Sequence, residues 1–266
     1  MKPQAPKDWC TTAMVIAVAL GLAACGGGDA PVLRGTAATG APLVEAQVSL
    51  VCASGPVLTT RTNAEGDWQL TLNAQRAPCA AQVSAEPLAN GLRYHGLSAS
   101  TDGGVLNITP LTDLVVTRLI GAEPTAWFAT LSPQTLRLYQ DSQRIKAAQT
   151  QVIDALGLQS VNAIDFMGSA FKAKPGQLAD DLLTALQAAS QQTQTTQASL
   201  RTVFASANGQ VSVDFKSALT NAFSAPAGGG SELMTACNIC RFNCQFDKDK
   251  WACLATCELL ACAGQE

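Results

Sequence analysis

Cysteine is the residue type whose number and spacing in this chain point most directly to chemistry. The 266 residues include ten cysteines, which is high for a cytosolic protein and ordinary for an exported one. Six of the ten lie close together near the C-terminus: Cys237, Cys240, Cys244, Cys253, Cys257 and Cys262. Thiols clustered in this way pair as disulfides, bind a metal ion as thiolates, or take part in redox exchange.

The spacing of these six cysteines favours two short helices joined by a turn, within residues 232–266. The first three are spaced i, i+3 and i+7, which places them on one helix face, and Cys253 and Cys257 share a face of a second helix. This spacing resembles that of α-hairpinins and of twin Cys-x3-Cys hairpins, in which nested disulfides cross an antiparallel helix pair. The predicted pairs are Cys237–Cys262, Cys240–Cys257 and Cys244–Cys253.

Other arrangements of the cluster stay open, because six cysteines allow 15 connectivities. Four thiolates could hold Zn²⁺, although only Cys237 and Cys240 have the Cys-x2-Cys spacing of a zinc knuckle and an oxidising compartment opposes free thiolates. Redox-active thiols are a third interpretation. We expect disulfides, with no metal and no cofactor.

The predicted hairpin is too short to bury its aromatic side chains in a core of its own. We therefore expect Phe242, Phe246 and Trp251 to be partly exposed on a disulfide-stabilised surface. Exposed aromatic side chains of this kind are where a partner would bind.

Few residues are suited to catalysis. His95 is the single histidine, and no Gly-x-Ser-x-Gly motif accompanies it, so we interpret it as a strand residue. Asp180 and Asp181 are adjacent carboxylates, but neighbouring helix positions point about 100° apart and do not converge on one substrate. We interpret them as solvated acids in the first turn of a helix. The sequence predicts no catalytic residues.

Residues 1–24 have the features of an export signal. Two lysines precede an apolar run of about 12 residues, which is too short to cross a bilayer as a helix. The run ends in Leu22-Ala23-Ala24-Cys25, which resembles a bacterial lipobox. The resemblance implies cleavage after Ala24, acylation of Cys25 and a flexible tether over residues 25–30; an ordinary cleaved signal is the alternative. Gly26 after the cysteine is similar to the pattern of outer-membrane lipoproteins.

Residues 31–108 have the alternating pattern of short strands. Apolar residues recur at every second position in 46–50, 67–72 and 81–85, and further strands are expected near 32–37, 57–61, 92–98 and 105–108. Such spacing favours a small antiparallel β-sandwich. Cys52 and Cys79 fall on the apolar faces of their strands, so we expect a disulfide between them, with two buried free thiols as the alternative.

Two motifs in this region resemble the transthyretin-like, carboxypeptidase-regulatory-like domain. The first spans residues 35–48, with Gly35, Gly40 and Pro42-Leu43 before a strand, and the second spans residues 62–70, with Asn63 and Gly66 before Trp68. Asn63 suits an Asx turn. The resemblance implies a β-sandwich that serves as a spacer or binding platform, and it implies no activity.

Residues 109–223 have the pattern of a helical domain. Thr109 is a residue type favoured at a helix N-cap, and Pro110 is one favoured at the first helical position. Gly121 is a residue type that commonly ends a helix. Apolar stripes predict further helices after Ser132, up to Gly157 and after Pro175, with a polar link at 191–196 and a Gly-rich linker at 224–231. A β module followed by alanine-rich helices resembles uncharacterised lipoproteins of β-proteobacteria.

Composition limits the classes of function. The formal charge of −3 gives no basic footprint for nucleic acid. We expect an α+β multidomain protein, exported and anchored in the outer membrane by lipid, with a non-enzymatic structural, adhesive or ligand-binding role towards an envelope protein or glycan. The alternatives are an accessory subunit of an envelope or secretion assembly and a hydrolase of peptidoglycan or polysaccharide.

Overall fold

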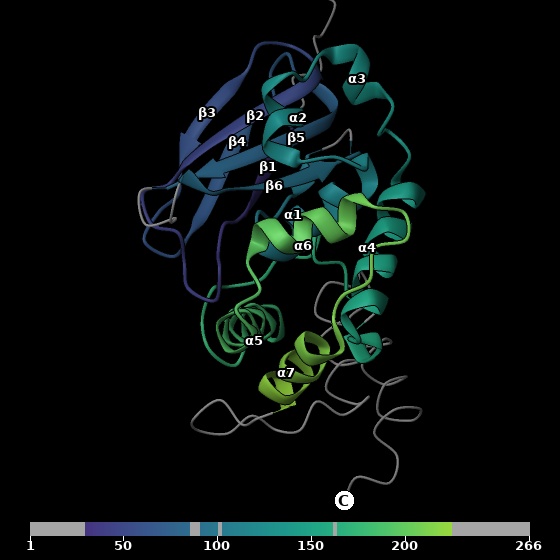
Figure 1. Ribbon diagram of the computed structural model, residues 1–266. Helices are drawn as coiled ribbons and strands as arrows, with labels where there is room; N and C mark the ends of the chain where they lie inside the picture. Colours follow the sequence, from purple (N-terminus) through teal and green to yellow (C-terminus); the bar gives the residue numbers. More distant parts are fainter. Residues whose placement is uncertain (1–29, 86–90, 101–102, 162–163, 225–266) are drawn as a thin grey trace, which may run out of the picture.

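The computed structural model describes residues 30–85, 91–100, 103–161 and 164–224. Over these residues the chain forms seven strands and then seven α-helices, so that an α+β fold is confirmed (Figure 1). The predicted signal peptide, Cys25, the linker from residue 225 on and the C-terminal hairpin lie outside the described residues. The three disulfides predicted there, and Phe242, Phe246 and Trp251, therefore stay predictions.

The strands form two sheets. Their bounds are β1 Val32–Thr36, β2 Gln47–Ser54, β3 Leu58–Arg61, β4 Asp67–Thr71, β5 Arg76–Ser84, β6 Arg93–Ser98 and β7 Gly104–Val105. One sheet has the order β4-β1-β7 and the other β3-β2-β5-β6. The prediction of purely antiparallel pairing is wrong at one edge, because β7 runs parallel to β1. The chain continues in that direction, as Ala37 and Ile108 form a further parallel bridge.

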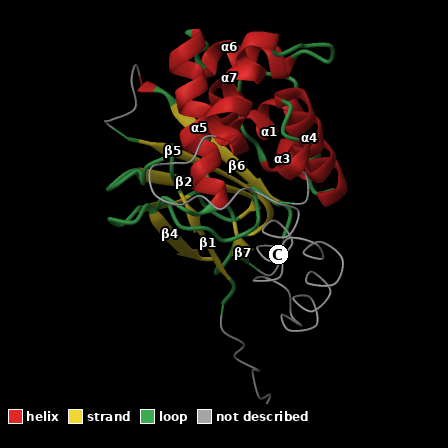
Figure 2. Ribbon diagram, turned by 90° about the horizontal axis from the view of Figure 1, so that it is seen from below, coloured by secondary structure: helices red, strands yellow, loops and turns green. Residues whose placement is uncertain are grey.

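Within the four-stranded sheet, β5 and β6 are buried on both faces, whereas the edge strand β3 is partly exposed. Val48, Leu50 and Val83 face the three-stranded sheet and join its Leu33 and Trp68 in one apolar cluster. The intervening positions of β2, β5 and β6 bury Ala53, Ala80 and Leu97 in a second cluster, which the helices complete. Figure 2 shows the resulting layers, with the helices on one side of the strands. Sheet and helices therefore share a core.

The helices begin and end largely at the predicted signals. They are α1 Pro110–Ile120, α2 Pro124–Ala129, α3 Pro133–Arg137, α4 Ser142–Leu156, α5 Leu178–Thr193, α6 Gln197–Ala205 and α7 Val213–Ser224, with a 3-10 turn at Gln159–Val161. Thr109 caps α1 in a capping box with Thr112, and Gly121 ends that helix in the left-handed conformation. Gly157 ends α4 in the same way.

Two helical details differ from the prediction. The polar segment 191–196 is not wholly a link, because α5 continues through Thr193 and only residues 194–196 connect it to α6. Helix α2 was not predicted, since its six residues are too few to establish a periodic pattern. Its first turn is nevertheless capped by a neighbouring residue, because the Glu123 carboxylate accepts a hydrogen bond from the Ala126 N–H.

The turn before β4 forms as its sequence predicts. The Asn63 side-chain oxygen accepts hydrogen bonds from the N–H groups of Glu65 and Asp67, at 3.0 and 2.8 Å, which is an Asx turn. Gly66 has a φ of 78°, and any side chain there would also collide with the Ala37 carbonyl. These contacts hold the start of β4 beside the end of β1.

Cys52 and Cys79 form the predicted disulfide. They are directly opposite each other on β2 and β5, with Cα atoms 4.0 Å apart, and both are buried. Closing a loop of 27 residues stabilises the folded state by about 3.5 kcal/mol in the chain-entropy model. Among the described residues no helix has the length and hydrophobicity required to cross a membrane.

Candidate functional site

His95 lies on β6, as predicted, and its side chain points toward the helices rather than to solvent. It is fully buried, and both of its ring nitrogens have partners. Nδ1 lies 2.7 Å from Oδ1 of Asp113 on α1, and Nε2 lies 2.7 Å from Nε2 of Gln82 on β5. Because the Gln82 side-chain oxygen accepts from Arg93, its amide N–H faces the ring. Nε2 is therefore an acceptor, and Nδ1 donates to Asp113.

Asp113 is the centre of this network. Its carboxylate is fully buried and accepts hydrogen bonds from three side chains. Besides His95, Arg201 of α6 donates from Nε and Nη2, at 2.8 and 3.0 Å, and Gln197 donates at 2.7 Å. These four bonds use the whole acceptor capacity of a carboxylate. The charge of Asp113 is thus compensated by Arg201, and hydrogen bonds from His95 and Gln197 satisfy its remaining acceptor sites.

Arg201 extends the hydrogen-bond network from buried Asp113 to residues nearer the surface. Its guanidinium also donates to the backbone oxygen of Arg93 and to Glu123 at 2.8 Å. Burial raises the pKa of Glu123, but hydrogen bonds from Ala126 and Thr125 and the charge of Arg201 outweigh it, so the net pKa lies below its ordinary value. Burial, and then the charge of Asp113, raise the pKa of Tyr94 to about 12. Glu123 therefore stays ionised at neutral pH and keeps its ion pair with Arg201.

The network joins elements and does not present a reactive group. Both nitrogens of His95 are occupied, and the ring is covered by Phe128, with ring centroids 5.7 Å apart. Sequence reasoning placed His95 on a strand but missed its hydrogen bond to Asp113. The signal that could have found it is the buried-strand pattern on both sides of Gln82 and His95, since two polar residues in doubly buried strands require partners.

Asp180 departs from the prediction. It lies in the first turn of α5, as expected, but it is not solvated: it is 2% exposed, and Oδ1 has no hydrogen-bond partner. Burial, and then the charge of Asp181, raise its pKa to about 6. Asp181 is partly exposed and accepts from the Gly176 N–H, so the two carboxylates do not converge. Tertiary packing of α5 decided the burial, which the sequence pattern alone does not reveal.

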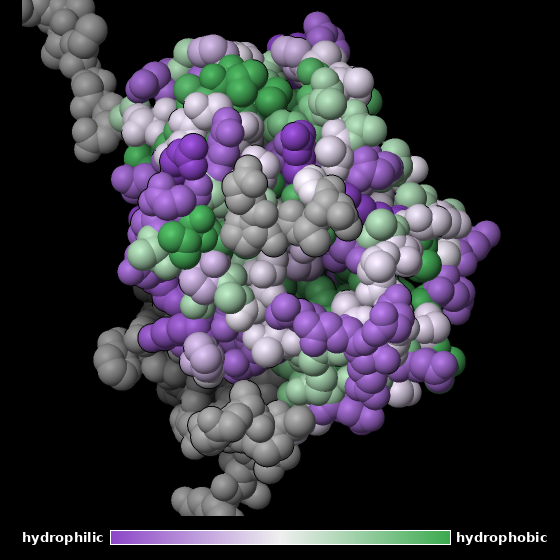
Figure 3. Space-filling view, turned by 60° about the vertical axis from the view of Figure 1, so that its left-hand side comes forward, coloured by the Kyte–Doolittle hydropathy of each residue, from purple (hydrophilic) through white to green (hydrophobic). Residues whose placement is uncertain are grey.

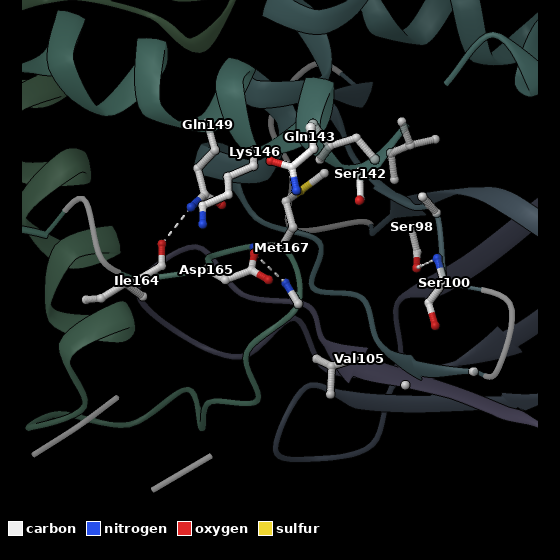
Figure 4. A pocket seen from close by; sticks show the side chains of 16 residues that line it. Ser98, Ser100, Val105, Ser142, Gln143, Lys146, Gln149, Ile164, Asp165 and Met167 are labelled. Atoms are coloured by element: carbon white, nitrogen blue, oxygen red, sulfur yellow. Dashed lines mark hydrogen bonds between the residues drawn. The ribbon is translucent and has the colours of Figure 1, made fainter. Parts of the chain in front are cut away.

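A cavity of about 660 Å³ opens at the end of β6, beside β7 and α4. Figure 4 shows Ser142, Gln143 and Lys146 of α4 on one side, and Ser98 and Ser100 on another. Apolar side chains, including Leu97, Ile145 and Met167, complete the lining. The volume lies within the range of small-molecule sites, and hydroxyl and amide groups predominate among its polar atoms.

A segment without regular structure, 164–172, forms one wall of this cavity. Gln149 of α4 donates to the Ile164 oxygen at 2.6 Å and accepts from the Phe166 N–H at 3.1 Å. On the other side, the amide of buried Asn107 donates to the oxygens of Phe166 and Ser169. Asp165 accepts from the N–H groups of residues 167 and 168. The wall is therefore fixed from both sides.

Among the described residues, the large apolar side chains exposed to solvent do not lie together on one element. On the face seen in Figure 3, hydrophobic residues form small groups among hydrophilic ones. The most exposed large apolar side chains in the described part of the chain lie on separate elements: Val32, Val44, Val57, Leu138 and Val213. The described residues also bring together no group of three His, Cys, Asp or Glu side chains that could hold a metal ion.

Comparisons of the chain with protein-family models, with curated protein sequences and with solved structures give no match. The resemblances to lipoproteins and to transthyretin-like domains therefore stay predictions from the sequence. Of the predicted site residues, the structure joins Cys52 to Cys79, and the others lie outside the described residues.

The Asp113 network predicts a large loss of stability on removal of its charge. Asp113→Asn keeps the shape of the side chain but leaves the buried guanidinium of Arg201 without its main partner. We expect the free energy of unfolding in urea to fall by about 3–5 kcal/mol. Glu65→Gln, in an exposed turn, is the control and should change it by less than about 0.5 kcal/mol. A loss under about 1 kcal/mol for Asp113→Asn would contradict the role of the network.

Asp180 predicts a pH-dependent stability. Its pKa of about 6 in the folded state exceeds the ordinary 3.8, so the folded protein binds more protons than the unfolded chain between pH 4 and 6. Stability from this residue is therefore greatest at low pH and is lost as pH rises through 6. Asp180→Asn should stabilise the protein by about 1–2 kcal/mol at pH 8 and not at pH 4. Urea unfolding at both pH values measures this.

Asp214→Asn is the control for that measurement, because Asp214 is an exposed acid in the first turn of α7. An equal effect of Asp180→Asn at pH 4 and pH 8 would show that ionisation of Asp180 does not govern the difference.

Proposed function

We propose that this protein is a non-enzymatic, lipid-anchored lipoprotein of the cell envelope that binds a glycan. The observation that carries the binding role is the cavity beside α4, with its lining of hydroxyl and amide groups. The anchor rests on the lipobox-like sequence that ends at Cys25. The Cys52–Cys79 disulfide supports passage through an oxidising compartment.

The chemistry of the cavity favours a polyhydroxylated ligand. Serine hydroxyls and glutamine amides each donate and accept hydrogen bonds, as sugar hydroxyl groups do. Ser98, Ser142 and Gln143 supply such groups, while Leu97 and Met167 supply apolar surface for the C–H faces of a sugar ring. Lys146 and Asp165 give one positive and one negative group, so the cavity itself is neutral.

The arrangement of the acids and bases supports binding without catalysis. The single histidine is fully buried and has both nitrogens engaged. Among the described residues, Asp165 is the one carboxylate in the lining of the cavity, whereas enzymes that hydrolyse glycosidic bonds ordinarily use a pair of carboxylates.

The proposed scaffold is a transthyretin-like β-sandwich formed by the two sheets. Its support is the apolar cluster between them and the agreement of the turn at Asn63 and Gly66 with the motif. In this proposal the sandwich serves as a platform, and the helices packed on it build the cavity. The tether over residues 25–30 would hold the platform at the outer membrane.

The anchor is tested on the native protein extracted from membranes with detergent. Its intact mass should equal that of the chain from Cys25 onward plus a diacylglycerol and an amide-linked fatty acid. Cys25→Ala should abolish the added lipid and prevent maturation, whereas Cys10→Ala, within the segment predicted to be removed, should change nothing. An unprocessed amino terminus on the native protein would contradict the proposal.

The binding role is tested with an array of envelope-derived oligosaccharides, followed by calorimetric titration of those retained. Gln143→Ala/Lys146→Ala removes two exposed cavity groups and should weaken binding at least about tenfold, which is about 1.4 kcal/mol. Gln134→Ala/Lys174→Ala is the matched control, because both residues are exposed and neither lines the cavity. Failure of every oligosaccharide to bind, or equal affinity of the two variants, would overturn the proposal.

A further inference from the structure

A second cavity, of about 630 Å³, adjoins the glycan-binding candidate. It lies over the three-stranded sheet, where Arg34 of β1 is opposite Gln69 of β4 and Val105 of β7. Val105 lines both cavities. The fixed segment 164–172 also lines both, with residues 165–168 along the first cavity and residues 170–172 along the second. The two hollows are therefore neighbours along one wall.

The second cavity differs from the first in charge. Arg34, Arg61 and Lys172 line it, against a single acid, Asp67. The Lys172 ammonium is engaged by Asp67, whereas neither arginine forms an ion pair with any described residue. Arg61 donates to the backbone oxygen of Glu45, which leaves its charge uncompensated. This positive excess stands out in a chain whose net charge is −3.

The floor of the second cavity is preformed. Buried Asn107 accepts from the Thr36 N–H at 3.1 Å and holds the wall at Ser169. Thr36 Oγ1 lies 2.9 Å from the Phe171 oxygen and 3.0 Å from the Asp67 carboxylate. Gly35 allows the chain to approach Leu106, whose carbonyl would collide with any side chain there. A rigid floor with two unpaired guanidinium groups is suited to carboxylates, which arginine binds in a bidentate manner.

We propose that the two cavities are subsites of one site for an extended acidic glycan. The neutral cavity takes sugar hydroxyl groups, and Arg34 and Arg61 take carboxylates one or more residues along the chain. This inference rests on the proposed glycan-binding function and adds its substrate class. Carboxylates are favoured over a free anion because the arginines adjoin a cavity whose polar lining suits sugars.

The test uses acidic oligosaccharides, including oligogalacturonates, each as the free acid and as its methyl ester. The pair differs in charge but shares a sugar backbone. The free acids should bind at least about tenfold more tightly than the esters, and the difference should shrink as NaCl is raised because salt screens exposed charges. Arg34→Gln/Arg61→Gln should remove the preference and leave ester binding unchanged.

Arg76→Gln/Arg137→Gln is the matched control. Both residues are exposed, neither lines either of the two cavities, and Arg76 donates to a backbone oxygen as Arg61 does. It should keep the preference, and melting temperatures should show that both double variants fold. Equal binding of acid and ester by the unaltered protein would overturn this inference alone. Failure of both forms to bind would overturn the proposed function as well. Displacement of the bound glycan by acetate or inorganic phosphate at a concentration equal to that of the glycan would point to a simple anion site.

Discussion

The carboxylate of Asp113 has no access to water, and its charge must be compensated within the protein. Arg201, on a helix 88 residues further along the chain, supplies the opposite charge, and His95 on a strand and Gln197 on the same helix donate hydrogen bonds. Breaking a buried pair of this kind costs about 3–5 kcal/mol, a large part of the 5–15 kcal/mol that stabilises a typical domain. The sheet and the helices are therefore coupled energetically by a polar contact as well as by a shared apolar core.

Local sequence patterns predicted most of the strands and helices, because the interactions that start and end them act within a few residues. Strand alternation, the caps of α1 and α4 and the Asn63 turn are all of this kind, and the facing of Cys52 and Cys79 followed from alternation alone. The burial of Asp180 could not be predicted, since an acid in the first turn of a helix is normally solvated and only the packing of α5 excludes water. The parallel β1–β7 pair likewise depends on a long return of the chain.

The candidate binding surface was beyond sequence reasoning for a related reason. Its wall, residues 164–172, has no periodic pattern and reads as a loop, yet two buried amides hold it: Gln149 from α4 and Asn107 beside β1. Each amide is separated from its partners by 15 or more residues, so no local sequence motif predicts these hydrogen bonds. A loop fixed to a rigid scaffold in this way presents a shaped surface without the entropy cost of ordering it on binding.

Charge is divided between the interior and the surface according to solvent access. The strongest pairs are buried and satisfied, so they contribute cohesion and leave no group to react. Arg34 and Arg61 remain in water, where a single ion pair contributes only about 0.2–1 kcal/mol. Two such contacts are too weak to hold a ligand, but they can discriminate between charged and neutral chains that the adjoining cavity binds equally. In the proposed site, therefore, hydrogen bonding in the neutral cavity determines affinity, and the arginines determine selectivity.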